Sequence, residues 1–203
     1  MIGKIFITSS GYDPQLGKHV KDPYLGPKAS LGACRPDVRR QVKERDHLFV
    51  ISGKLPNVRQ FVMGGFEVAQ KIDAVQAYEQ FPGQRLRMRD DGQLTGNVIV
   101  DASGAQHELD THDPATFAKR TPNYIVGTDC ISLVYPAEIA LGREQTLDVL
   151  REIFKKNGGS PFEIVGHYGS NLTEDQVREL RKWLLSLKKV TKRPNIFERR
   201  CGQ

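Results

Sequence analysis

The chain lacks the features that would place it at once in a secreted, membrane-spanning or metal-binding class. Its 203 residues include three cysteines, Cys34, Cys130 and Cys201, without a CxxC pair, so we expect neither a disulfide framework nor a cysteine zinc site. No apolar run approaches the roughly 18 residues of a membrane-spanning helix, and the first residues lack a signal peptide's apolar core. These absences predict a cytoplasmic protein without a membrane partner.

The common catalytic signatures are absent as well. The patterns GxxxxGK[ST], GxGxxG, GxSxG and HExxH do not occur, so P-loop hydrolysis, dinucleotide redox chemistry, α/β-hydrolase chemistry and zincin proteolysis have no sequence support. A His/Asp cluster at His107, Asp110, His112 and Asp113 has a spacing that fits no standard zinc site. We therefore predict no bound metal and no cofactor.

Positive charge, in contrast, is concentrated in one part of the chain. The formal charge of +6 and the pI near 9.3 are moderate, but basic residues crowd the first quarter of the chain. They are Lys18, Lys21, Lys28, Arg35, Arg39, Arg40, Lys43 and Arg45. Such clustering is the electrostatic footprint of a protein that binds a polyanion such as nucleic acid, although a solvated basic surface has the same composition.

The apolar pattern predicts strands through most of the chain. Two β-branched and aromatic runs, 47–53 and 61–68, flank a polar turn at 54–57 and predict a central antiparallel hairpin. Residues 5–8 predict a first, buried strand. Further strands are expected at 85–89, 97–100, 106–109, 121–127 and 131–134.

Helix signals are fewer and become dominant near the C-terminus. Pro36 opens a short basic helix in which Val38 and Val42 face the core. Asp73 can cap a second helix, residues 146–154 form a third, and a capping box at Thr173 precedes a fourth. The fold class expected is α+β, a curved mixed sheet or pseudo-barrel with peripheral helices and a C-terminal helical pair. Its parts are a domain at 1–135, a helical extension packed on it at 136–190, and a basic tail at 191–203.

A long irregular segment between the first strand and the first helix is the strongest candidate for function. Residues 14–33 are rich in glycine and proline, yet they carry aromatic rings and both signs of charge, unlike a flexible linker. Asp13, His19 and Asp22 could supply acid–base chemistry if they lay within reach of a substrate. These three residues are our candidates for catalysis.

Binding of nucleic acid requires groups that stack on a base, groups that read its edge, and cations for phosphates. Tyr12, Tyr24, Arg35, Ser52, Asn123 and Tyr124 provide the first two kinds. The loop and the basic helix provide the cations Lys18, Lys21, Lys28, Arg39, Arg40 and Lys43. For each residue taken alone, packing or ordinary surface polarity is an alternative explanation.

Several short motifs also resemble a known family. The first strand ends in SSGYDP at 9–14, GACR follows at 32–35, and the central hairpin reads KERDHLFVISG at 43–53 and VMGGFEV at 62–68. In outline this is similar to the EVE and ASCH branches of the PUA-like superfamily, and more narrowly to a nucleotide-modification-associated domain. The resemblance implies a PUA-like fold and recognition of a modified or flipped base in DNA or RNA. It places Ser10, Gly11, Tyr12, Arg35, Ser52 and Gly53 around the base.

Three functional classes therefore remain at this point. The first is a module that binds DNA or RNA containing a modified base. The second is an enzyme that hydrolyses or processes a modified nucleotide or nucleic acid, and the third is a structural, partner-binding protein. The first hypothesis predicts a cavity, bounded by the segment after Thr8 and the strand end near Ser52, that holds a single nucleobase.

Overall fold

A mixed sheet of six strands forms the centre of the protein. The computed structural model describes residues 2–191, and the sheet order is β2-β7-β4-β3-β1-β8. The strands are β1 (Gly3–Gly11), β2 (Ser30–Leu31), β3 (His47–Gly53), β4 (Val62–Ile72), β7 (Tyr124–Ser132) and β8 (Ser170–Leu172). All neighbours are antiparallel except β1 and β3, which run parallel. The α+β class is confirmed, but the sheet has two open edges and is not closed into a barrel.

The central hairpin is formed as the sequence predicts. β3 is buried along its whole length and pairs with β4, while β4 pairs on its other side with β7. Gly64 and Gly65 lie in the middle of β4, where a Cβ on Gly64 would come within 2.3 Å of the Ile131 carbonyl oxygen. Because β7 approaches so closely there, only glycine fits.

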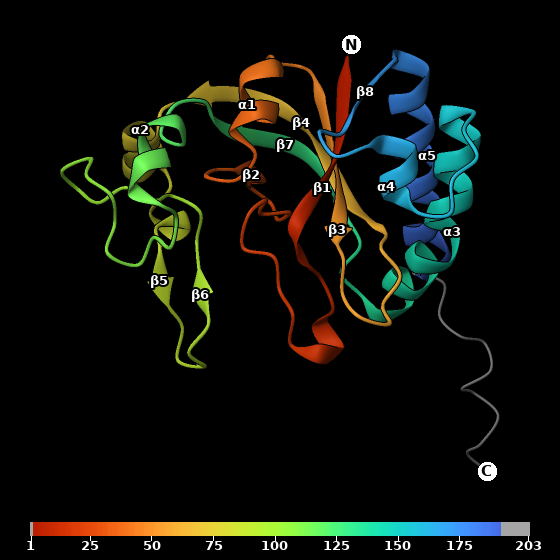
Figure 1. Cartoon of the computed structure of the whole chain (residues 1–203), viewed down its shortest axis with the longest axis horizontal. Helices are drawn as coiled ribbons and strands as arrows, with labels where there is room; N and C mark the ends of the chain where they lie inside the picture. Colours follow the sequence, from red (N-terminus) through yellow and green to blue (C-terminus); the bar gives the residue numbers. More distant parts are fainter. Residues whose placement is uncertain (1, 192–203) are drawn as a thin grey trace.

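Helices cover one side of the sheet and one of its ends. α3 (Pro136–Phe154), α4 (Pro161–Val165) and α5 (Glu174–Thr191) lie together on one side (Figure 1), whereas α1 (Pro36–Gln41) follows β2. α2 (Ala74–Gln80) lies away from α3–α5, beside a small separate hairpin of β5 (Arg87–Met88) and β6 (Leu94–Thr95). Short 3-10 turns occupy Pro14–Leu16 (η1), Pro82–Gln84 (η2) and Pro114–Lys119 (η3).

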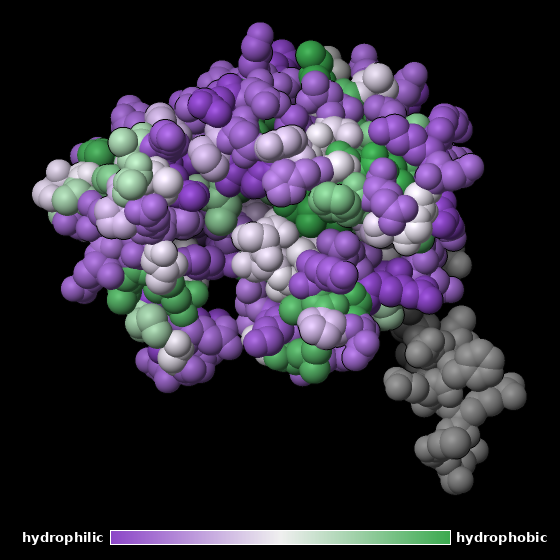
Figure 2. Space-filling view, viewed as in Figure 1, coloured by the Kyte–Doolittle hydropathy of each residue, from purple (hydrophilic) through white to green (hydrophobic). Residues whose placement is uncertain are grey.

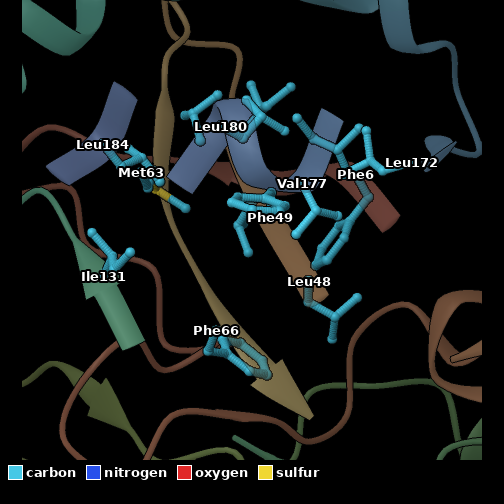
Figure 3. Packing of buried hydrophobic residues seen from close by; sticks show 14 of the residues in the cluster. Phe6, Leu48, Phe49, Met63, Phe66, Ile131, Leu172, Val177, Leu180 and Leu184 are labelled. Atoms are coloured by element: carbon cyan, nitrogen blue, oxygen red, sulfur yellow. The ribbon is translucent and has the colours of Figure 1, made fainter. Parts of the chain in front are cut away.

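The main hydrophobic core lies between the sheet and α5. Val177 and Leu180 of α5 pack toward Phe6 of β1 and Phe49 of β3 (Figure 3), and all four side chains are at most 1% exposed. The C-terminal segment also supplies β8, which pairs with β1. The segment after residue 135 therefore contributes both a strand and core side chains to the same sheet. The basic tail expected at 191–203 lies outside the described residues, apart from the backbone of Thr191.

Some predicted strands are shorter or arranged differently. The segments 121–127 and 131–134 contribute to one strand, β7, and the strand expected at 85–89 is reduced to Arg87–Met88. The hairpin expected from 97–100 and 106–109 is reduced to a single bridge between Val100 and Gln106. Val98, Ile99 and Val100 are instead buried as an irregular segment, so their apolar run reflects packing rather than a strand.

Candidate functional site

The parallel strands β1 and β3 end side by side, and the long loop of residues 12–29 begins there (Figure 1). Gly11 pairs with Gly53, and a Cβ on Gly53 would lie 2.7 Å from the Ser10 carbonyl. Ser52 is buried, and its Oγ accepts a hydrogen bond of 3.1 Å from the Phe61 N–H. Ser52, Gly53 and Gly11 thus fix the close approach of the two strand ends. Among the described residues, none of these three lines a cavity that we identify.

Asp22 holds the inner side of the loop in place. Its carboxylate is buried and accepts hydrogen bonds from the backbone N–H groups of Gly32, Ala33 and Cys34. It also accepts from the Asn97 side-chain amide at 3.0 Å. With four donors around it, Asp22 has a structural role, and this arrangement offers no support for the catalytic role that the sequence left open.

Arg39 is a buried cation whose charge interacts with the Asp22 carboxylate. It is 0% exposed, and its five N–H donors are directed to five backbone carbonyls. The acceptors belong to Ala33, Cys34, Arg120, Pro122 and Asn123. Burial lowers the pKa of the guanidinium to about 10, while the charge of Asp22 opposes that shift. Arg39 therefore joins α1 to the segment before β7 and is not available to a phosphate, contrary to the sequence prediction.

Tyr124 and Asn123 also belong to this buried polar cluster. The Tyr124 hydroxyl donates to the Asn97 Oδ1 at 2.7 Å, and burial raises the pKa of that hydroxyl. Asn123 has a left-handed backbone, with φ of 60°, and its carbonyl accepts from Arg39. Both residues were predicted to contact a base, but Tyr124 is only 1% exposed and cannot stack on a ligand.

Two further predicted residues are engaged in contacts within the fold. Arg35 forms two hydrogen bonds with the Asp37 carboxylate, at 3.0 and 2.7 Å, and its guanidinium lies 5.3 Å from the centre of the Phe6 ring. Asp13 caps η1 and forms an ion pair of 3.0 Å with Arg143. Both side chains are thus held in place by contacts within the protein.

The outer side of the same loop forms one wall of a basic groove. This groove has a volume of about 580 Å³, and its other wall is the β5–β6 hairpin. Its cationic lining residues are Lys18, Lys21, Arg87 and Arg89, and His19 and Tyr24 line it as well. No aspartate or glutamate among the described residues lines it. Figure 2 shows the surface hollowed between the loop and the hairpin.

A smaller aromatic pocket of about 210 Å³ adjoins the basic groove. Tyr12, His19 and Tyr24 contribute rings, and apolar walls come from Met63 of β4 and from Leu133, the residue after β7. The rings of Tyr12 and His19 meet edge to face, with their centres 6.4 Å apart. Partial burial raises the pKa of the Tyr12 hydroxyl, which keeps it in the neutral form that can donate a hydrogen bond.

The groove and the pocket share three residues, His19, Val20 and Tyr24. A cavity suited to a flat ring therefore lies directly beside one suited to an anion. Of the predicted site residues, the structure brings Ser10, Tyr12, Lys18, His19, Lys21 and Tyr24 to this composite site.

Other predicted cations lie elsewhere. Lys28 is exposed, with its ammonium 5.9 Å from the centre of the Phe81 ring. Arg40 and Lys43 are exposed at the end of α1, away from the groove. All three lie outside the lining of the basic groove.

The sequence also contained a signal for two residues that were not assigned to the site. Arg87 and Arg89 alternate with Met88 and lie on one face of the predicted strand, which is how both reach the groove. Arg85, two positions earlier, instead stacks on Tyr78 at 3.8 Å and donates to its carbonyl. No local pattern could have identified Met63 or Leu133, because β4 and β7 meet the loop only in the folded protein.

Within the described residues, no group of three or more His, Cys, Asp or Glu side chains is placed to hold a metal ion. The described helices include none with the length and apolarity needed to cross a bilayer. Comparisons with protein-family models, curated proteins and solved structures gave no match.

Proposed function

We propose that the protein binds nucleic acid at the composite site, with one base in the aromatic pocket and the adjoining phosphate in the basic groove. The observation that carries this proposal is the sharing of His19, Val20 and Tyr24 between the two cavities. A base stacks on aromatic rings through its face, and Lys and Arg neutralise the phosphate next to it. A base must leave its duplex stack to enter such a pocket, so the ligand is single-stranded or flipped out.

The proposal includes recognition of a modified base by a PUA-like module. This part rests on the motifs at 9–14, 32–35 and 43–68. The pocket is bounded by Met63 and Leu133, whose side chains can contact a substituent on the base. DNA and RNA both contain the base and phosphate that the site would hold.

An enzyme acting on a modified nucleotide is less well supported. Asp13 and Asp22, two of its three candidate residues, are occupied by an ion pair and by backbone N–H groups. Of the three, His19 alone lies at the composite site, and neither cavity is lined by an aspartate or glutamate of the described residues that could act with it.

Binding of short oligonucleotides at two salt concentrations tests the proposal. Single-stranded DNA and RNA with unmodified and modified bases, labelled at the 3′ end, would be titrated by fluorescence anisotropy. The double variant Lys18→Gln/Arg87→Gln should bind at least about ten-fold more weakly and should reduce the slope of log K against log salt by about 2.

The matched control removes two charges that lie away from the groove. Arg40→Gln/Lys43→Gln alters net charge equally, so it should retain affinity within about two-fold if binding depends on the groove. Equal losses in the two double variants would show that only overall charge matters. No binding of any oligonucleotide would remove nucleic acid as the ligand.

A further inference from the structure

We propose that the basic groove is a phosphomonoester site, so that the nucleic-acid ligand presents a terminal phosphate at this position. This inference rests on the proposed function and makes it more specific. The shared chemistry is a nucleoside that carries a terminal phosphate, and it has two sources, the end of a strand and a free nucleotide.

The first argument is the number of positive charges around one cavity. Lys18 and Lys21 come from the loop, and Arg87 and Arg89 face them from the hairpin across a volume of about 580 Å³. A phosphate inside a strand carries one negative charge. A terminal phosphate carries about −1.5 to −2 near pH 7 and has three strong acceptor oxygens. Three exposed cations and a fourth with a buried ammonium, without a lining carboxylate among the described residues, match the second group better than the first.

The second argument is the arrangement of these charges. A surface that follows a strand distributes its cations along the backbone. Here the cations come from two walls instead, and Gly17 and Gly83 also line the groove, with open space where their Cβ atoms would lie. Because glycine has no side chain, a bulky anionic group can approach the backbone closely at these points. The result is a single anion site beside the aromatic pocket rather than a continuous track.

The third argument is the state of the cations in the protein. The Lys21 ammonium is buried and has no hydrogen-bond partner among the described residues. A buried charge is costly unless it is paired, so an anion bound next to Lys21 would relieve that cost once the side chain turns toward it. Arg87 donates to the Gly83 carbonyl at 2.8 Å, which orients its guanidinium and leaves its other N–H groups for a ligand.

Arg89 contributes less than the other three cations. It forms an exposed ion pair with Asp91, with 3.5 Å between Nη2 and Oδ2. Asp91 lies at the tip of the hairpin and outside the lining of the groove. Lys18, Lys21 and Arg87 are therefore the residues on which discrimination of a terminal phosphate should depend.

Matched oligonucleotides that differ only at their ends provide the test. A single strand labelled internally would be prepared with a 5′-phosphate, with a 3′-phosphate, and with hydroxyl groups at both ends. We expect one phosphorylated form to bind at least about ten-fold more tightly than the form with two hydroxyl ends. The preference should shrink below about pH 6, where the monoester dianion takes up a proton and becomes a monoanion.

Variants connect that preference to the groove. Arg87 is exposed, so the Arg87→Gln variant should fold. We expect it to reduce the preference for the phosphorylated strand at least about five-fold and to change the affinity for the dihydroxyl strand less. Lys21→Met should act in the same direction. Arg59→Gln, in a separate groove between the β3–β4 turn and α3, is the matched control and should leave the preference unchanged.

Competition with a nucleoside monophosphate identifies the source of the phosphate. If the mononucleotide displaces the labelled strand at concentrations similar to those of the unlabelled phosphorylated strand, the ligand is a free nucleotide. If only the phosphorylated strand displaces it, the ligand is a strand end. Binding of all three strands within two-fold of one another would overturn the phosphomonoester site while leaving the proposed nucleic-acid function intact. Absence of all binding would overturn both.

Discussion

The loop of residues 12–29 has two sides with opposite chemistry. On the inner side, the Asp13 and Asp22 carboxylates are buried and saturated by N–H donors or by Arg143. On the outer side, Lys18 and His19 are exposed and face a groove without lining carboxylates among the described residues. The acids of this loop therefore stabilise the fold, whereas Lys18 and His19 are exposed at the site where we propose that a ligand binds.

Arg39 and Arg40 provide the largest expected contrast, because two adjacent arginines differ fully in burial. Arg39→Met leaves five backbone carbonyls without their donor and removes the charge near Asp22, so we expect a loss of about 3–5 kcal/mol in the free energy of unfolding. Arg40→Met should change it by less than about 0.5 kcal/mol. Urea denaturation of both variants measures the difference. Similar values for the two would contradict the role assigned to Arg39.

Replacement of Asp22 should have the next largest effect on stability, and it distinguishes a structural role of this residue from a catalytic one. In Asp22→Asn an amide replaces one acceptor oxygen opposite backbone N–H donors, and we expect a loss of about 2–3 kcal/mol in stability. The folded variant should still bind oligonucleotides within about two-fold of the unchanged protein, since the carboxylate faces away from the groove. Asp90→Asn, at the exposed tip of the hairpin, is the control. A stable Asp22→Asn protein that had lost binding would show that Asp22 serves the ligand.

The smallest expected effect concerns the buried histidine His47, which lies in β3 outside the loop. His47 is 2% exposed, its Nδ1 has no hydrogen-bond partner among the described residues, and its Nε2 lies 3.9 Å from the Glu67 carboxylate. Burial lowers the pKa of His47; Arg181 lowers it further, and Glu67, Asp129 and Asp46 oppose the shift. The imidazole is thus neutral in the folded protein at pH 7, as it mostly is in the unfolded chain.

Below pH 6.5 the unfolded chain takes up a proton on His47 before the folded protein does, so stability should fall as the pH drops toward the folded pKa. We expect this loss to be a fraction of that caused by Arg39→Met. His47→Gln should show a flatter dependence between pH 7.5 and 5.5 in urea denaturation. Parallel curves for the two proteins would indicate that His47 does not contribute to the pH dependence.

Local signals in the sequence identified much of the fold. Pro36 begins α1 as expected, Asp73 caps α2, and the Thr173 capping box begins α5 with both of its hydrogen bonds formed. These features depend on residues within a few positions of one another, so the sequence is sufficient to predict them.

Contacts between distant segments were not predictable in the same way. The helical pattern placed Val38 and Val42 toward the core and Arg39 elsewhere, but the carbonyls that bury Arg39 come from residues 120–123 as well as 33–34. Tyr124 was assigned to a ligand because its ring could stack on a base, and no local pattern shows which side of the strand the ring faces. Its partner Asn97, 27 residues away, determines that it points inward.

The β5–β6 hairpin pairs only with itself and makes no ladder with the six-stranded sheet. It nevertheless carries Arg87 and Arg89, half of the lysines and arginines in the groove. At the proposed site, a change of sequence or length in this hairpin would alter the cations available to the ligand without disturbing the pairing of the main sheet. Residues 85–96 are therefore the segment in which variants would test the selectivity of the proposed site with the least effect on the six-stranded sheet.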